Sequence, residues 1–202
     1  MRYIFLFGLA AVISGCASRN VNWDYNPSVS LGSLKYYAWY PGEKTSVESG
    51  YDADALTQKR ITSAVTRTLR SKGFIEIPTN DISTERGRMA DFYIHATYRI
   101  SPRLQAIQTS NCLDCGFYYP SYPWGANVYS TTNFRPYNEG TLTLDVINPR
   151  NKQVIWSGSS WARISKTASP MERTDQIKAA VKKILSGFPR PNKSYYDDDD
   201  DF

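Results

Sequence analysis

The sequence is poor in the residues that most often carry out chemistry. It contains one histidine, His95, and three cysteines, Cys16, Cys112 and Cys115. Acid–base and nucleophilic catalysis usually depends on a cluster of such side chains, and no GxSxG, HExxH or Walker-type motif occurs. His95 lies on the polar side of an alternating segment, as an ordinary surface histidine does. We therefore expect no catalytic residues, no cofactor and no metal site.

Long hydrophobic runs are also missing. The most apolar stretch, residues 4–12, is too short for a membrane-spanning helix of about 20 residues but suits the core of a signal peptide. Residues 13–16, Ile-Ser-Gly-Cys, resemble a lipobox, in which small residues precede a cysteine that carries a diacylglycerol. We expect a signal peptide over residues 1–15 and a lipidated N-terminus and tether over residues 16–22, with lipidation at Cys16. The alternative is a plain signal peptide followed by an incidental cysteine.

Lipidation at Cys16 implies a protein of the bacterial cell envelope that is attached to the membrane through its lipid anchor. One acyl chain anchors only marginally, so the two or three chains of a lipoprotein are needed for firm attachment. By resemblance to sorted lipoproteins, Ala17 after the cysteine indicates the outer membrane, facing the periplasm. Nucleic acid is not an expected partner there, and no nucleic-acid-binding motif occurs.

Charge is unevenly distributed along the chain. The formal net charge is +5 although five aspartates occupy residues 197–201, so the rest of the chain is more strongly basic. A basic body suits an anionic component of the envelope or another envelope protein, and the alternative is that the charge serves solubility alone. We expect residues 191–202 to form a disordered acidic tail.

The two cysteines other than Cys16 are separated by two residues. In an oxidising compartment spare thiols usually pair, so a Cys112–Cys115 disulfide is expected. A thioredoxin-like redox pair needs its first cysteine at a helix N-terminus, whereas residues 116–120 are a poor helix start. A zinc site needs about four ligands. The redox pair and the metal site or free thiols remain alternatives to the disulfide.

Apolar periodicity predicts a single α+β domain over residues 23–190. Strands are expected at residues 34–40, 91–100, 141–147 and 153–164, and turn residues at 148–151 join the last two. One helix is expected over residues 53–72, and a second begins at a capping box, Ser169-Pro170-Met171-Glu172. Both helices end in a Gly-Phe pair. The prediction is an antiparallel β-sheet with two helices packed on one face.

Residues 116–138 do not follow this periodicity. They are rich in aromatic residues and contain three prolines, so we expect a long aromatic loop inserted between two strands. Loops of this length in compact domains are usually functional or disordered. Tyrosine and tryptophan offer apolar faces with polar tips, so the candidate binding residues are Tyr118, Tyr119, Tyr122, Trp124 and Tyr129. The alternative is that these rings only pack on the sheet.

Several short segments occur in a characteristic order: residues 23–27 (WDYNP), 35–39 (KYYAW), 61–65 (Ile-x-x-Ala-Val), 72–74 (KGF), 90–92 (ADF), 140–145 (GTLTLD) and 154–158 (VIWSG). Together they resemble a bacterial lipoprotein family known as domain of unknown function 4136. The resemblance covers most of residues 21–188. It implies a small α+β envelope domain without an established activity, and it carries over no catalytic or binding residue.

Together these observations predict a lipid-anchored envelope lipoprotein, which acts as a non-catalytic binding or structural module in the periplasm. The alternative function is an envelope enzyme or thiol-redox factor that uses Cys112 and Cys115.

Overall fold

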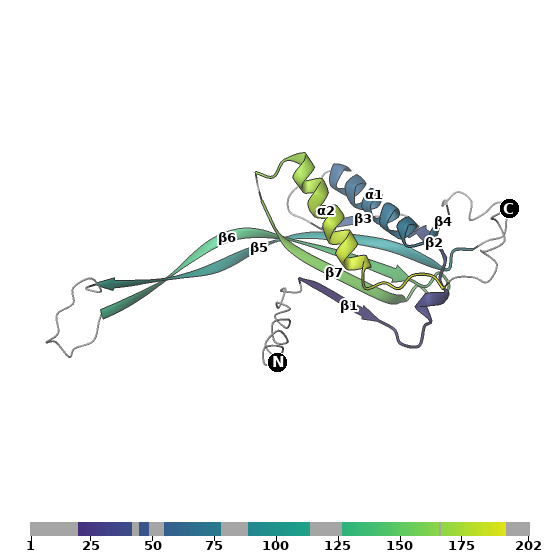
Figure 1. Ribbon diagram of the computed structural model, residues 1–202, viewed down its shortest axis with the longest axis horizontal. Coiled ribbons are helices and arrows are strands. Elements are labelled where there is room, and N and C mark those ends of the chain that lie inside the picture. The colour runs from purple at the N-terminus through teal and green to yellow at the C-terminus, as the bar shows by residue number, and fades with distance from the viewer. Residues whose placement is uncertain are drawn as a thin grey trace, which may run out of the picture.

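A mixed β-sheet carries two α-helices on one of its faces (Figure 1). The computed structural model describes residues 20–41, 45–48, 55–77, 89–113, 127–165 and 167–192. The strands are β1 (Val21–Tyr25), β2 (Tyr36–Trp39), β3 (Thr45–Glu48), β4 (Ile75–Glu76), β5 (Phe92–Leu113), β6 (Asn127–Ile147) and β7 (Val154–Ile164). The helices are α1 (Ala55–Ser71) and α2 (Pro170–Leu185), and a 3₁₀ turn, η1, covers Leu31–Ser33. The predicted α+β class, with two helices packed against the sheet, is confirmed.

The sheet is antiparallel on one side and parallel on the other. Its order is β1-β7-β6-β5-β2-β4, and β3 also pairs with β5. The pairs among β1, β7, β6 and β5 are antiparallel, as predicted for β5, β6 and β7, whereas β1 was not expected to be a strand. By contrast, β2 and β3 run parallel to β5, and β4 runs parallel to β2. Parallel strands need a long crossover connection, and α1 supplies one by leading from β3 to β4.

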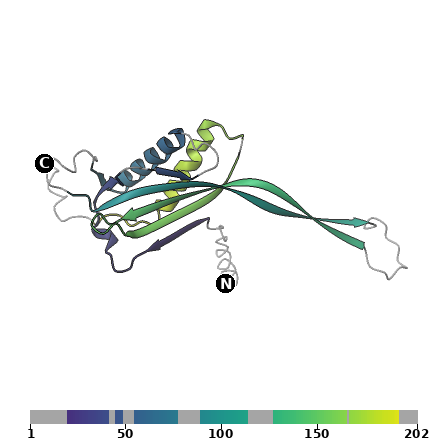
Figure 2. The same cartoon turned by 180° about the vertical axis from the view of Figure 1, so that it is seen from behind.

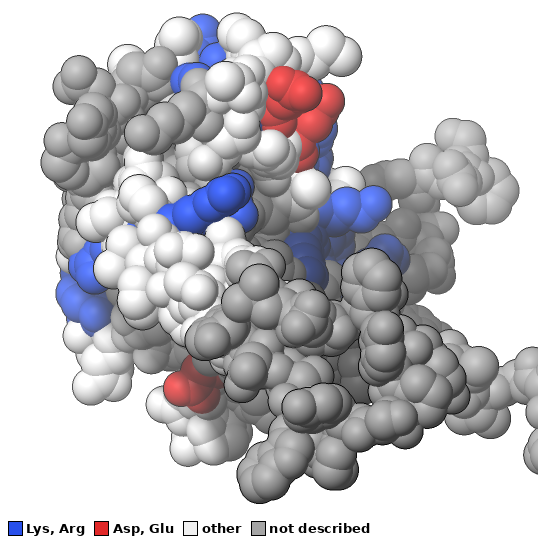
Figure 3. Space-filling view, turned by 90° about the vertical axis from the view of Figure 1, so that its left-hand side faces the viewer, with Lys and Arg blue, Asp and Glu red and all other residues white. Residues whose placement is uncertain are grey.

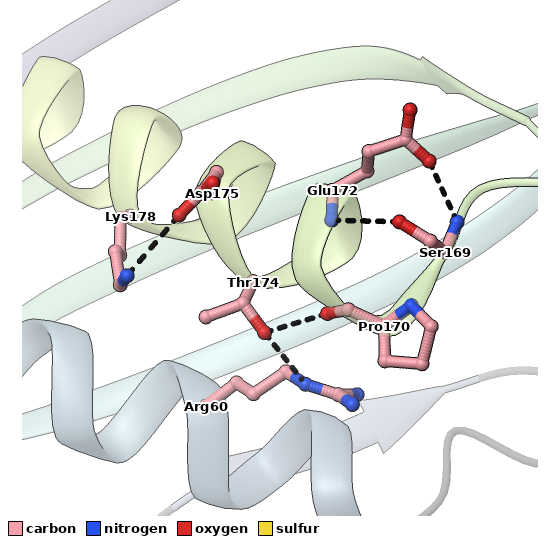
Figure 4. A network of polar contacts seen from close by, with 7 residues as sticks. All are labelled: Arg60, Ser169, Pro170, Glu172, Thr174, Asp175 and Lys178. Carbon is pink, nitrogen blue, oxygen red and sulfur yellow. Dashed lines mark hydrogen bonds and ion pairs between the residues drawn. The ribbon is translucent and has the colours of Figure 1, made fainter.

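The start of α2 has the predicted capping box (Figure 4). The Ser169 hydroxyl oxygen accepts a hydrogen bond from the Glu172 backbone N–H at 3.3 Å. The Glu172 carboxylate in turn accepts one from the Ser169 backbone N–H at 2.7 Å. Pro170 occupies the first helical position, where its missing N–H removes no helical hydrogen bond.

The end of α1 depends on a glycine in the left-handed conformation. Gly73 has a φ of 96°, which a residue with a β-carbon rarely adopts. The Phe74 N–H donates to the Leu69 carbonyl at 3.1 Å, and the Gly73 N–H donates to the Arg70 carbonyl at 3.0 Å. This pair of bonds is a Schellman motif, and it turns Phe74 back into the core.

The core lies between the helices and the sheet. In β5, Phe92, Ile94 and Ala96 are fully buried on the helix side, as their alternation predicted. The opposite side is not wholly exposed, because Tyr93 packs in a second, smaller apolar cluster beside Ala38. The largest fully buried side chains include Trp39, Trp156, Tyr37, Phe92 and Phe188.

Strands β5 and β6 form one long hairpin whose outer half leaves the body (Figures 1 and 2). Their pairing runs from Tyr93–Ile147 to Leu113–Asn127, while β7 ends beside β6 at the Asn138–Ile164 pair. With 22 residues, β5 is roughly 70 Å long at the usual rise per residue.

Two predicted boundaries are wrong. The aromatic loop expected over residues 116–138 is strand from Asn127 onward, because β5 pairs with that segment along its whole length. Prolines are tolerated in strands that border solvent, so Pro136 does not interrupt β6. The tether expected over residues 16–22 ends earlier, since Val21 begins β1 and pairs with Ser160.

Candidate functional site

Most site residues predicted from the sequence lie outside the described residues. These are Cys16, Cys115, Tyr118, Tyr119, Tyr122 and Trp124, together with the signal peptide at residues 1–15 and the tail from residue 193. Only backbone placement is described for Cys112, which pairs with Val128, and for Tyr129, which pairs with Asn111 near the outer end of the hairpin. The lipidation, the disulfide and the aromatic binding residues therefore stay predictions.

The outer half of the hairpin, residues 103–113 and 127–137, is called the arm below. Among the described strands, the arm has no neighbour beyond β5 and β6 themselves, so both of its outer edges are unpaired. A two-stranded ribbon is only marginally stable alone in water. An open strand edge also presents a row of N–H and C=O groups that another chain can pair with. The arm therefore has the properties of an interaction element.

One face of the arm carries an apolar patch formed by Leu104, Ala106, Phe134 and Pro136. Leu104 pairs with Pro136, and Ala106 pairs with Phe134, so the four side chains project from the same face. The side chains of Leu104 and Phe134 are 69% and 65% exposed. Contiguous exposed apolar residues rimmed by polar ones commonly mark an interaction surface, so this patch is the first candidate site.

The opposite face of the arm is braced against the body at its base. Arg163 of β7 donates from Nη2 to the Gln105 side-chain oxygen at 2.7 Å, and its guanidinium lies 4.2 Å from the centre of the Tyr137 ring. Arg103 forms an ion pair with Glu139 at 3.2 Å. These contacts orient the base of the arm. They all lie on the face opposite the apolar patch, so none of these side chains covers it.

A cleft between the two helices and the sheet is the second candidate site. Its volume is about 530 Å³, within the roughly 300–1,000 Å³ typical of ligand pockets. It lies at the base of the arm, where Asn138 and Ile164 form the last pair between β6 and β7. Its lining includes Ile61, Tyr98, Leu142, Arg173, Ile177 and Ala180.

Small residues at positions that face the helices create this cleft. Along β6, the residues on this side change from Leu144 in the core to Gly140 in the cleft, and Ala162 of β7 also lines it. A Cβ atom at position 140 would lie 2.7 Å from the Tyr98 hydroxyl oxygen and 2.9 Å from the Ile164 Cδ1 atom. Glycine is therefore required there for the Tyr98 ring to extend along the sheet into the cleft.

Tyr98 and Arg173 provide polar groups beside the apolar lining. Burial raises the pKa of the Tyr98 hydroxyl, and the nearby positive charge of Arg173 opposes this shift. The hydroxyl is therefore a neutral donor at physiological pH. Arg173 donates from Nε to the Ala168 carbonyl at 3.1 Å. Within the described part of the chain, no hydrogen bond reaches the Tyr98 hydroxyl or the terminal nitrogens of Arg173.

Two hydrogen bonds join the two helical segments, one at each end. Near the helix starts, Arg60 donates from Nε to the Thr174 hydroxyl at 3.1 Å, and that hydroxyl donates to the Pro170 carbonyl at 2.7 Å (Figure 4). Near the helix ends, Lys72 donates from Nζ to the Leu185 carbonyl at 2.8 Å. Burial lowers the pKa of Lys72, with a smaller contribution from the Arg190 charge. The two helices therefore run parallel, and both begin at the cleft.

The one histidine has no catalytic arrangement around it. His95 is half-buried on the sheet face opposite the helices, and its ring centre lies 6.0 Å from that of Tyr40. Its cross-strand neighbour Asp145 instead accepts a hydrogen bond from the Ser157 hydroxyl at 2.6 Å. An activated nucleophile requires a base within hydrogen-bond reach of it, and the described residues show no such bond from His95 to Ser157.

Over the described residues, the chain has neither a metal-binding cluster nor a membrane-spanning helix. No group of three or more His, Cys, Asp or Glu side chains is placed to hold a metal ion. No helix in those ranges combines the length and apolar character needed to cross a bilayer.

Sequence reasoning identified neither the apolar patch nor the cleft. The β-branched and aromatic residues of segment 127–138 are typical of strands, and this composition was the available signal for the arm. The cleft had no comparable signal, because Gly140, Ala162 and Ala180 are ordinary small residues that become informative only when they lie opposite one another.

Solved structures are similar to this chain at low sequence identity. A PelC dodecamer from Paraburkholderia phytofirmans is 14% identical, with a TM-score of 0.45, and the match covers 86% of this chain and 98% of that one. A PDZ domain protein from Parabacteroides distasonis is 11% identical, with a TM-score of 0.47, over 86% of this chain and 36% of that one. None of the curated proteins compared matches this chain. The sequence profile described as domain of unknown function (DUF4136) matches residues 21–190, and the chain therefore belongs to this family.

Proposed function

We propose that the protein is a lipid-anchored lipoprotein of the bacterial envelope, a non-catalytic module that binds another envelope protein through its arm. The observation that carries this proposal is the exposure of Leu104 and Phe134 on a ribbon with two unpaired edges. Apolar surface removed from water contributes about 25 cal/mol per Å², so covering both side chains favours association.

The chemistry of the arm favours a protein partner over the interior of a bilayer. On the same face, the patch is followed toward the outer end of the arm by the polar pair Thr132 and Gln108. Open strand edges are not tolerated in hydrocarbon, because their backbone groups would lose all hydrogen bonds. A partner protein can cover the patch and also add a strand to either edge, as in β-augmentation.

The lipid anchor is supported by the lipobox-like residues 13–16 and by the short distance between Cys16 and the body. Asn20 is tied to β7, because its side chain donates to the Trp161 carbonyl at 2.9 Å and its carbonyl accepts from the Ser160 hydroxyl at 2.9 Å. Four residues of chain span at most about 14 Å. An anchored body would therefore stay close to the membrane surface.

Site-specific photo-crosslinking in the native host tests the arm. A photoreactive phenylalanine analogue replaces Phe134 in the full-length protein, and adducts are purified and identified by mass spectrometry. The matched control carries the analogue at Met171, which is 75% exposed on α2 and outside the arm. We expect a discrete adduct with an envelope protein from position 134 and none from position 171.

Two results of this experiment would contradict the proposal. One is the absence of any adduct from Phe134 in cells that carry the protein at its normal level. The other is the same adducts from both positions, because these would reflect collisions rather than a defined surface. If the only adducts contain two copies of this chain, the arm binds a second copy of the protein and not a different envelope protein.

A further inference from the structure

The cleft at the base of the arm lies outside the surface proposed to bind a protein, and its lining suits a different kind of ligand. Its accessible apolar lining is aliphatic, with Ile177 on α2, Ile100 on β5 and Ile164 on β7. Ile61 and Leu142, which also border the cleft, are buried in the core. An aliphatic lining of this kind suits a hydrocarbon chain, because transfer of each CH₂ group from water contributes about 0.8 kcal/mol.

The polar side of the cleft is suited to an anion. Arg173 lines the cleft with a charge that no described carboxylate neutralises at ion-pair distance. Its neighbour Glu172 is engaged by the Ser169 N–H, and Asp175 forms an ion pair with Lys178 at 3.1 Å. Guanidinium groups bind carboxylate and phosphate through paired N–H donors. The Tyr98 hydroxyl also lines the cleft and lies close enough to Arg173 for the arginine charge to affect the pKa of the tyrosine.

The surroundings strengthen this preference for negative charge. Parallel α1 and α2 both begin at this end of the body, and helix N-termini favour anions. Basic side chains lie at several places on the described surface that faces the outer end of the arm, and acidic side chains lie beside some of them (Figure 3). Arg60, one residue before the cleft residue Ile61, uses its Nε atom to bond Thr174 and adds a second positive charge at the start of the two helices.

We propose that the cleft binds a single-chain amphiphile with an anionic head group. The aliphatic chain packs against Ile100, Ile164 and Ile177, and the head group accepts hydrogen bonds from Arg173 and the Tyr98 hydroxyl. A fatty-acid carboxylate and a lysolipid phosphate share this chemistry. The site consists of residues outside the arm, so it does not depend on the protein partner proposed above.

A fluorescent fatty acid tests binding directly. The mature chain, residues 16–202, carries Cys16→Ser so that no attached lipid competes, and cis-parinaric acid is titrated into it. We expect saturable fluorescence enhancement with one site per chain. Displacement by lysophosphatidic acid or by palmitate then distinguishes a phosphate head group from a carboxylate. An absence of saturable enhancement would overturn the proposal.

A pair of equal substitutions on α2 locates the ligand. Ala180→Leu places extra volume inside the cleft, whereas Ala179→Leu places it on the exposed side of the same helix. We expect Ala180→Leu to weaken parinaric acid binding about tenfold or more, and Ala179→Leu to leave it within about twofold. If Ala180→Leu unfolds at a different temperature from the parent protein, Ala162→Leu on β7 is used in its place, because it fills the same part of the cleft from the sheet. Equal effects of the inner and outer substitutions would contradict the assignment.

The charge of the head group is tested on the same helix. Arg173→Gln should weaken binding of the fatty acid about tenfold but leave binding of the corresponding fatty alcohol nearly unchanged, because only the acid loses an ionic hydrogen bond. Lys178→Gln removes an equal charge from the exposed side of α2 and should change neither affinity. An equal loss for acid and alcohol in Arg173→Gln would refute the contact with the head group.

Discussion

Phe74 and Phe188, the residues that follow the terminal glycines of the two helices, stack on each other in the core. Their ring centroids lie 5.2 Å apart with an interplanar angle of 21°. Phe92 contacts both rings at 5.6 Å, and Trp156 lies 5.1 Å from Phe188. The Gly-Phe ending shared by α1 and α2 thus has a structural reason, because parallel helices that end at the same level bring the two rings together. This aromatic cluster closes the end of the core opposite the cleft.

Removal of the Phe188 ring should strongly destabilise the fold. Phe188 is 1% exposed and contacts three aromatic rings, and truncation of such a side chain typically costs 3–5 kcal/mol. Urea unfolding of Phe188→Ala should therefore show a free energy of unfolding lower by about 4 kcal/mol. The matched control is Phe134→Ala on the arm, where a loss below about 0.5 kcal/mol is expected. Similar losses in both variants would mean that Phe134 is also packed in solution.

Loss of the α2 cap should have a smaller effect. Ser169→Ala removes the hydroxyl that accepts from the Glu172 N–H, and such changes cost about 1 kcal/mol. Ser169→Asp keeps an accepting oxygen at the same position and should retain most of the stability. Thermal and urea unfolding of the two variants measure the difference, which would be absent if the helix began elsewhere.

The same capping box predicts a pH dependence. Hydrogen bonds from the backbone and side chain of Ser169 lower the pKa of Glu172 below its usual value. The stabilisation from the ionised carboxylate is therefore fully present above the pKa of the unfolded state, and it is lost as the pH falls through the lower pKa of the folded state. Melting temperatures of the parent and Glu172→Gln should differ at pH 7 and converge as the pH falls below the pKa of the folded state, where the carboxyl is protonated. A difference that stays constant over this range would show that the carboxylate charge is not involved.

Lipidation at Cys16 predicts a definite mass for the processed protein. Wild-type protein from the native host should begin at residue 16 and carry acyl chains, whereas Cys16→Ala should keep residues 1–15 and incorporate no labelled palmitate. Cys112→Ala serves as the control and should be processed normally. Intact-mass measurement of the three proteins decides this, and an unmodified cysteine at position 16 would remove the lipid anchor from the proposed function.

The expected disulfide between Cys112 and Cys115 is testable by thiol titration. Unreduced, unfolded mature protein should expose no reactive thiol, and reduction should release two. Two thiols that react before reduction would show that the pair is free and would return attention to the redox alternative. Cys112→Ser is informative as well, because it should leave one reactive thiol at Cys115.

Several elements could be predicted because their signals are local in the chain. The start of α2 depends on residues within one turn of Ser169, and the end of α1 depends on Gly73 with its neighbours. Alternation along β5 likewise located the buried side of that strand from consecutive residues. Strand partners are different, because their pairing joins segments far apart in sequence. The parallel pairs of β2 and β3 with β5 therefore could not be read from composition.

The sequence by itself determined the two helices, their caps, the buried faces and the family, since each rests on short-range patterns of apolar and capping residues. The tertiary structure alone decided the arm and the cleft. Leu104 and Phe134 are exposed because α1 and α2 cover the sheet only over the body, while β5 and β6 continue beyond the end of β7 at Ile164 (Figure 1). The cleft exists because small residues on separate elements, Gly140 and Ala180 among them, are brought opposite one another by folding. Neither feature is a property of any one segment, because each depends on what its neighbours in space leave uncovered.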